Sequence, residues 1–275
     1  MIEFKDVCFS YEEGTEFIKN VNFIINPGEF VSVLGGNGSG KTTLARLMNG
    51  LLLPNAGEIV VDGLSTSKEE NSLEILQKVG MIFQDPTRQL VASTVEDELA
   101  FGPENLGIDP QEIRRRIDWS LRALNIEELR YKEPHYLSGG QTQRVAIASV
   151  LVMYPQYMIM DEPTAMLDPQ GRENVLEAID FLRRELGIAI IYVTHHMEEV
   201  LHGDRVLVID KGQLAFDGSV KELFARSELV KRANLELPQI IKLIELLNKK
   251  GYSLTYCDDW KILAENISQS LSERA

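Results

Sequence analysis

The sequence has 275 residues, of which 44% are hydrophobic, and this is enough for one large folded domain with a small appendage. The formal net charge of −14 argues against a protein that coats nucleic acid, because neutralising phosphates requires a basic face. No segment approaches the ~18 consecutive apolar residues that a membrane-spanning helix needs. We therefore expect any membrane attachment to run through a partner. Cys8 and Cys257 match no metal or redox spacing, so we expect reduced thiols in a reducing compartment.

The first part of the chain is rich in strand patterns. We predict strands over 2–9, 16–25, 30–34 and 79–83, a hairpin at Asp62-Gly63, and one helix over 42–49. Between the strand ending at Leu34 and that helix lies Gly35-Gly36-Asn37-Gly38-Ser39-Gly40-Lys41-Thr42, which matches G-x-x-x-x-G-K-[ST]. The motif therefore stands in the strand–loop–helix setting that it requires.

This loop is predicted to bind the phosphates of a nucleotide. Its glycines let the backbone wrap round an anion, so that successive N–H groups and the positive helix end point at the phosphates. Lys41 is expected to reach the β- and γ-phosphates, and Thr42 is expected to ligate Mg²⁺. We also expect Thr43 to be a nucleotide-binding residue. Taken alone, the pattern is also compatible with a simple glycine-rich turn.

The chain then becomes mostly helical, from about residue 94 to 154. Asp109 is predicted to cap a helix that has Pro110 in its first turn and Glu112 completing a capping box. We interpret this stretch as an inserted helical subdomain. Beyond it, apolar strands over 157–160, 189–193 and 205–209, the first two separated by a helix over about 169–186, indicate a parallel α/β sheet.

The strand over 157–160 ends in two adjacent carboxylates. Asp161 is placed to hold Mg²⁺ through its water shell, and Glu162 to accept a proton from an attacking water. An isolated Asp-Glu pair is often only a charged turn, and it is the upstream phosphate loop that favours the catalytic interpretation.

The C-terminal part begins at about residue 226. Before it, Lys211-Gly212 is predicted to turn between two strands, and a capping box from Ser219 to Glu222 to open a short helix. Ile240 to Leu247 form a helical apolar stripe that ends at Gly251. We therefore expect a nucleotide-binding domain over 1–225 and an α+β or helical appendage over 226–275 that serves as a dimerisation element.

The pentapeptide Leu137-Ser138-Gly139-Gly140-Gln141, with Gln143-Arg144-Val145-Ala146 after it, resembles the signature of ATP-binding-cassette ATPases. The resemblance covers about residues 1–225. It implies a P-loop α/β fold with an antiparallel β subdomain, and hydrolysis of ATP with Mg²⁺. In such proteins the residue that matches Tyr11 stacks on adenine, and the residue that matches Gln84 touches Mg²⁺. The residue that matches Asp168 communicates between the two active sites of the dimer, and the one that matches His195 is the switch histidine. Ser138 to Gln141 would then face the ATP of a second subunit from a helix N-terminus. Met166 stands where a small residue is common in the family.

Two further segments, 83–90 and 94–105, are similar to the ATPase subunits of energy-coupling-factor importers, including the cobalt-type members. The resemblance implies import of vitamins or transition-metal ions at the cytoplasmic face of the cell membrane. The implied partners are a second identical or paralogous ATPase, a transmembrane coupling protein and a substrate-binding membrane protein, with no nucleic acid. An exporter ATPase and a non-transport cassette are the alternatives. The acidic run Asp85, Glu96, Asp97, Glu98 and Glu104 is either a solvated face or a groove that receives arginine-bearing coupling helices.

Overall fold

Two sheets form the framework of the computed structural model, which describes residues 1–12, 15–233, 235–257 and 260–272. The first is antiparallel and has the order β2 (Ile18–Ile25), β1 (Ile2–Phe9), β4 (Ala56–Val61), β5 (Leu64–Ser65). The second has the order β10 (Gln213–Gly218), β9 (Arg205–Asp210), β3 (Phe30–Leu34), β8 (Ala189–Val193), β7 (Tyr157–Asp161), β6 (Val79–Ile82). In this second sheet only the pairing of β10 with β9 is antiparallel among the described strands. The predicted α/β fold class is confirmed.

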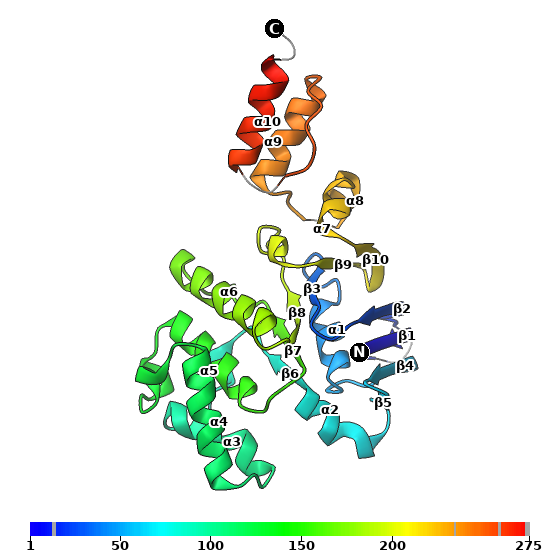
Figure 1. The fold of residues 1–275 in the computed structure, drawn as a ribbon. Helices are drawn as coiled ribbons and strands as arrows, with labels where there is room; N and C mark the ends of the chain where they lie inside the picture. The colour runs from blue at the N-terminus through cyan, green and yellow to red at the C-terminus, as the bar shows by residue number, and fades with distance from the viewer. Residues whose placement is uncertain (13–14, 234, 258–259, 273–275) are drawn as a thin grey trace.

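Burial along the strands explains the two kinds of sheet. Strand β2 alternates buried and exposed side chains, as expected of a sheet with one face towards the core. Strands β3, β7 and β8 are buried at every position, because helices cover both faces of the parallel sheet. Helix α1 (Lys41–Met48) lies between the two sheets in Figure 1 and contacts strands of both. Helix α2 (Ser72–Lys78) lies next to β6.

The predicted helical segment forms a group at the lower left of Figure 1. It comprises α3 (Val95–Asn105), α4 (Pro110–Ala123) and α5 (Gly139–Leu151), with α6 (Pro169–Arg184) beside α5. Gly80 of β6 allows the close approach of α5, since a Cβ there would lie 2.1 Å from Val150 Cγ1. Asp109 caps α4 as predicted, but Glu112 pairs with Arg116 at 3.1 Å rather than being held by a capping box.

The C-terminal elements are α7 (Val220–Phe224), α8 (Ser227–Arg232), α9 (Gln239–Lys249) and α10 (Trp260–Ser272). The structure describes helices and no strand over 226–233, 235–257 and 260–272. Leu235, Ile240 and Leu263 share one apolar cluster with Val206 and Val208 of β9. One apolar cluster therefore extends from the parallel sheet into the appendage, and α7 contacts both β9 and β10. Among the described helices, none is long and apolar enough to span a bilayer.

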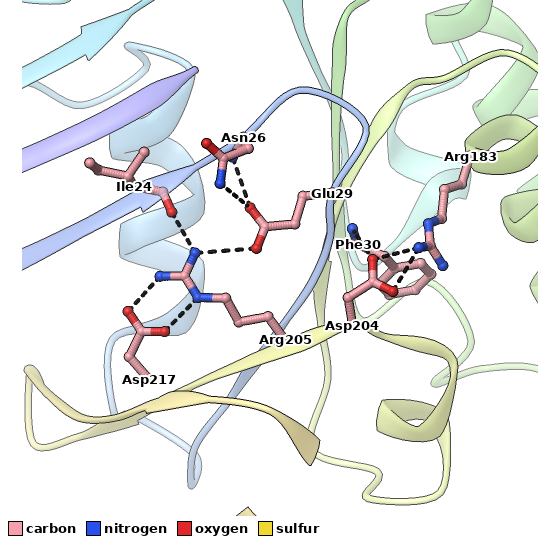
Figure 2. Close-up of polar contacts among 8 residues, drawn as sticks. All are labelled: Ile24, Asn26, Glu29, Phe30, Arg183, Asp204, Arg205 and Asp217. Carbon is pink, nitrogen blue, oxygen red and sulfur yellow. Dashed lines mark hydrogen bonds and ion pairs between the residues drawn. The ribbon is translucent and has the colours of Figure 1, made fainter. Parts of the chain in front are cut away.

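Figure 2 shows an arginine that joins the two sheets. Arg205, at the start of β9, donates to the carbonyl oxygen of Ile24 on β2 at 2.7 Å and to Glu29 at 3.2 Å. Its guanidinium also forms a bidentate pair with Asp217 on β10. This network connects the antiparallel sheet to the parallel sheet.

Candidate functional site

Several of the predicted site residues lie at or just after the carboxyl ends of four parallel strands. The phosphate loop follows β3, Gln84 follows β6, Asp161 and Glu162 end β7, and His195 follows β8. Because the strands are parallel neighbours, these ends meet at one edge of the sheet, where ligands bind in open α/β folds. The sheet topology therefore brings together residues that lie up to 160 positions apart.

The phosphate loop curls round the ammonium group of Lys41. The backbone of Gly40 has a φ of 112°, in the left-handed region that favours glycine, and a Cβ there would meet Ile18 Cδ1 at 2.7 Å. Lys41 Nζ donates to the carbonyl oxygens of Gly35 at 2.9 Å and Gly36 at 3.1 Å. Burial lowers the pKa of Lys41, while the charges of Glu162 and Asp161 act in the opposite direction. The loop thus holds one desolvated cation at its centre.

Asp161 and Thr42 offer oxygen ligands beside this loop. Asp161 is buried, and burial raises the pKa of its carboxyl, against a hydrogen bond from the Thr42 side chain and the charge of Lys41. A carboxylate and a hydroxyl of this kind fit Mg²⁺, which binds through one or two carboxylates plus substrate phosphates. The described residues contain no cluster of three or more His, Cys, Asp and Glu able to hold a metal ion.

Glu162 is the centre of a second group. His195 Nδ1 lies 2.9 Å from Glu162 Oε1, and Gln84 Nε2 donates to Glu162 Oε2 at 2.9 Å. Glu162 itself has a φ of 48°, and its N–H donates to the carbonyl oxygen of Val193 at 2.9 Å. Three loops from three strand ends therefore orient one carboxylate, the arrangement that a general base requires.

Tyr11 lies at the other end of the phosphate loop. Its hydroxyl is 2.9 Å from Thr43 Oγ1, and Phe9 and Phe17 contact its ring edge-on. Tyr11 as a whole residue remains 55% exposed. An aromatic face that is fixed at its edges and open to solvent is suited to stacking on a base.

The signature residues form a separate half-site. Ser138 caps α5 in a reciprocal capping box with Gln141, so that Gly139 and Gly140 present the first N–H groups of the helix. They line a cavity of about 430 Å³ together with Met166, Leu167 and Asp168. Asp168 accepts a hydrogen bond from Gly171 N at 2.7 Å and caps α6. No phosphate-loop residue lines this cavity.

A second cavity, of about 700 Å³, was not foreseen from the sequence. It is lined by Gly35 to Asn37, by His195 to Glu198, and by Glu236 to Gln239 with Lys242 of the appendage. Only folding brings residues 236–242 beside the phosphate loop. The single local signal is the Leu237-Pro238 break before α9.

The acidic run has local partners. Glu96 accepts from Arg130 at 2.7 Å, Asp97 accepts from the Thr94 hydroxyl at 2.7 Å, and Glu98 accepts from Val91 N at 2.8 Å. Glu96 and Asp97 are therefore unsuitable for a charge-reversal test of docking, because replacing them would also disturb the start of α3. The docking role of this segment stays a prediction.

Comparison with known proteins shows which family this chain resembles. The family model described as ABC transporter matches residues 18–165. An energy-coupling factor transporter ATP-binding protein from Clostridium perfringens is 48% identical over 260 residues, which cover 93% of this chain and 92% of the relative.

Solved structures are similar over most of the chain. The structure of cbiO1 from Clostridium perfringens, described as part of the ABC transporter complex cbiONQ, has a TM-score of 0.78 and 39% identity. It covers 89% of this chain and 98% of its own. An ATP-binding cassette described as dimeric, in a post-hydrolysis state bound to ADP and Pi, has a TM-score of 0.71 and 30% identity over 80% of this chain and 99% of its own.

Proposed function

The chain belongs to the ABC transporter family, and from this premise we propose that it is the ATP-hydrolysing, energy-coupling subunit of an energy-coupling-factor importer. The reaction is ATP + H₂O to ADP and phosphate. The relatives named as energy-coupling factor ATP-binding proteins and the cbiO1 structure support the importer over an exporter or a non-transport cassette.

One observation carries the catalytic proposal: Glu162 lies between His195 and Gln84, immediately after the buried Asp161 that contacts Thr42 of the phosphate loop. Glu162 orients and deprotonates the attacking water, His195 holds the Glu162 carboxylate in place, and Lys41 binds the phosphates. Thr42, Gln84 and Asp161 would hold Mg²⁺, which neutralises charge on the phosphate oxygens when bound. Tyr11 stacks on the adenine ring.

The half-site at Ser138 to Gln141 supports a dimeric mechanism. These residues present helix N–H groups to a cavity that no phosphate-loop residue of the same chain lines. A second ATPase subunit, identical or paralogous, would supply the phosphate loop that faces them. ATP then closes the dimer, hydrolysis allows it to open, and Asp168 communicates between the two sites.

The proposed partners beyond the dimer are membrane proteins. The chain would sit at the cytoplasmic face of the cell membrane, beneath a transmembrane coupling protein and a substrate-binding protein for a vitamin or a transition-metal ion. Residues 1–225 would form the ATPase domain, and residues 226–275 would assist dimerisation. Pulling down the tagged chain from detergent-solubilised membranes and identifying the bound proteins tests this assignment.

The catalytic proposal is tested by Glu162→Gln. The variant keeps the shape of the side chain but lacks the base, so we expect ATP affinity to be retained and turnover to fall by about two to four orders of magnitude. Steady-state ATPase assays and nucleotide titration measure the two effects. Wild-type turnover in Glu162→Gln would reject the assignment.

Lys41→Ala is the comparison variant. It removes a charge-assisted contact with the phosphates, so ATP binding itself is expected to fail. The two variants thus separate binding from chemistry.

A further inference from the structure

A buried carboxylate that the mechanism above does not use lies behind the catalytic residues. Glu199 is in the short 3-10 turn Glu199–His202, four residues after His195, and is 3% exposed. A buried carboxylate is costly unless hydrogen bonds compensate for the lost water. The hydrogen-bond partners of Glu199 therefore indicate the role of this buried carboxylate.

Three hydroxyl groups surround this carboxylate. Thr164 Oγ1 donates to Glu199 Oε1 at 2.5 Å, while Tyr192 OH and Thr194 Oγ1 donate to Oε2 at 3.1 and 2.6 Å. Thr164 and Tyr192 are also within 3.2 Å of each other, and Thr194 Oγ1 accepts from the backbone N–H of His196 at 3.0 Å. The network is closed, and such networks fix the parts of the chain that they join.

Two of the three partners belong to functional loops, and the third, Tyr192, lies on strand β8. Thr164 lies two residues after Glu162, in the loop that leads to Asp168, whereas Thr194 immediately precedes His195. Glu199 accepts from the first loop through one carboxylate oxygen and from the second through the other. It therefore provides a second connection between these loops, behind the direct contact of Glu162 with His195.

Arg172 connects Glu199 to the end of the loop from Thr164 to Asp168. It lies in the first turn of α6, its backbone N–H donates to the carbonyl oxygen of Asp168 at 2.9 Å, and its Nε is 3.7 Å from Glu199 Oε1. That Nε has no hydrogen-bond acceptor among the described residues. A shift of the loop at Asp168 would thus change the distance between a guanidinium and a buried carboxylate.

We propose that Glu199 is a positioning residue that couples the loop from Thr164 to Asp168 to His195. The inference rests on the proposed function, in which Asp168 lies at the dimer interface and His195 orients Glu162. Closure of the dimer on the loop moves Thr164, and the Glu199 carboxylate transmits this movement to Thr194 and the adjacent His195. Hydrolysis then depends on the state of the interface.

The first test replaces Glu199 by Gln in the full-length chain. Gln keeps the shape but has one acceptor oxygen, so it cannot accept hydroxyls of both loops on two oxygens. We expect ATP affinity within about twofold of wild type and a turnover about 10- to 100-fold lower, as for a small misplacement of a catalytic group. Glu29→Gln is the matched control, because Glu29 also accepts hydrogen bonds at a largely buried position but far from these loops. Its turnover should be unchanged.

The second test distinguishes coupling from general stability by combining Glu199→Gln with Asp168→Asn, which retains a capping side chain. If Glu199 and Asp168 act through one connection, the ATP turnover of the double variant should equal that of the slower single variant. If the two losses multiply, the residues act independently and the proposal is wrong. An unchanged rate in Asp168→Asn also overturns it, since nothing would then pass through the loop.

Folding is checked by thermal unfolding and ATP titration of every variant. If Glu199→Gln does not fold, Thr194→Val, which removes one hydroxyl of the network at nearly constant shape, takes its place in the cycle under the same criteria. Wild-type turnover in Glu162→Gln would reject the proposed function. If Glu162→Gln is inactive but the losses of Glu199→Gln and Asp168→Asn multiply in the double variant, the proposed function stands and only the positioning role of Glu199 is rejected.

Discussion

Tyr11 combines two separable features in one side chain. Its ring is largely exposed beside the phosphate loop, and its hydroxyl contacts Thr43. If the ring stacks on adenine, Tyr11→Ala should weaken ATP binding by about 3- to 12-fold, the size of an aromatic stacking contribution. Isothermal titration with ATP measures this change.

Tyr11→Phe is the control at the same position, because it keeps the ring and loses only the contact with Thr43. We expect its ATP affinity to stay within about twofold of wild type. Equal losses in the two variants would assign the effect to the hydroxyl instead.

Helices α5 and α7 begin with the same structural element. Ser138 caps α5 with Gln141, and Ser219 caps α7 with Glu222, each in a reciprocal capping box. Ser138→Ala and Ser219→Ala should therefore each lower the free energy of unfolding by about 1 kcal/mol. Only Ser138→Ala should also weaken the ATP-dependent dimer, by about tenfold, because its hydroxyl would face the nucleotide of the partner.

Size-exclusion chromatography of both variants in the Glu162→Gln background measures the dimer. Ser138→Arg, which adds bulk to the cavity beside Met166, should abolish the dimer while ATP still binds to the chain's own phosphate loop. An undiminished dimer in Ser138→Arg would show that the half-site does not face a second subunit.

Arg205 forms polar contacts that connect the two sheets. Arg205 bonds to Ile24, Glu29 and Asp217, which lie on or beside three different strands (Figure 2). Arg205→Met should lower the free energy of unfolding by about 1.5–3 kcal/mol, since it leaves two partly buried carboxylates without their cation. Urea unfolding followed by circular dichroism measures this loss.

Arg184→Met is the control for the arginine. Arg184 pairs with Asp180 one helical turn away and is largely exposed, so its loss should cost no more than about 0.5 kcal/mol. Similar losses in the two variants would show that the network in Figure 2 does not hold the sheets together.

Patterns within short segments predicted most of the elements. The strand over 30–34 and the capping box at Ser219 match the structure residue for residue, because apolar runs and caps act over a few positions. The phosphate loop and the acids after β7 were found in the same way. The site residues drawn from family resemblance remain predictions of role, although the structure brings Gln84, Glu162 and His195 into contact.

The ion-pair partners of two acidic residues were not predicted from the sequence. Glu112 has the spacing of a capping box but pairs with Arg116, and Glu96 has the appearance of a surface acid but binds Arg130. Arg116 lies four residues from Glu112 on the same helix, so this ion pair competes locally with the cap. Arg130 lies 34 residues from Glu96 and reaches it only when the chain has packed.

The sequence by itself determined where a phosphate-binding loop is predicted, since the loop, its lysine and the helix N-terminus are contiguous and their geometry is local. The tertiary structure alone decided that Glu162 meets His195 and that Glu199 joins Thr164 to Thr194. It also decided that Glu236 to Gln239 and Lys242 line a cavity with Gly35 to Asn37. The physical reason is the parallel sheet. It gathers strand ends that are far apart in the chain, and only packing determines which of them become neighbours.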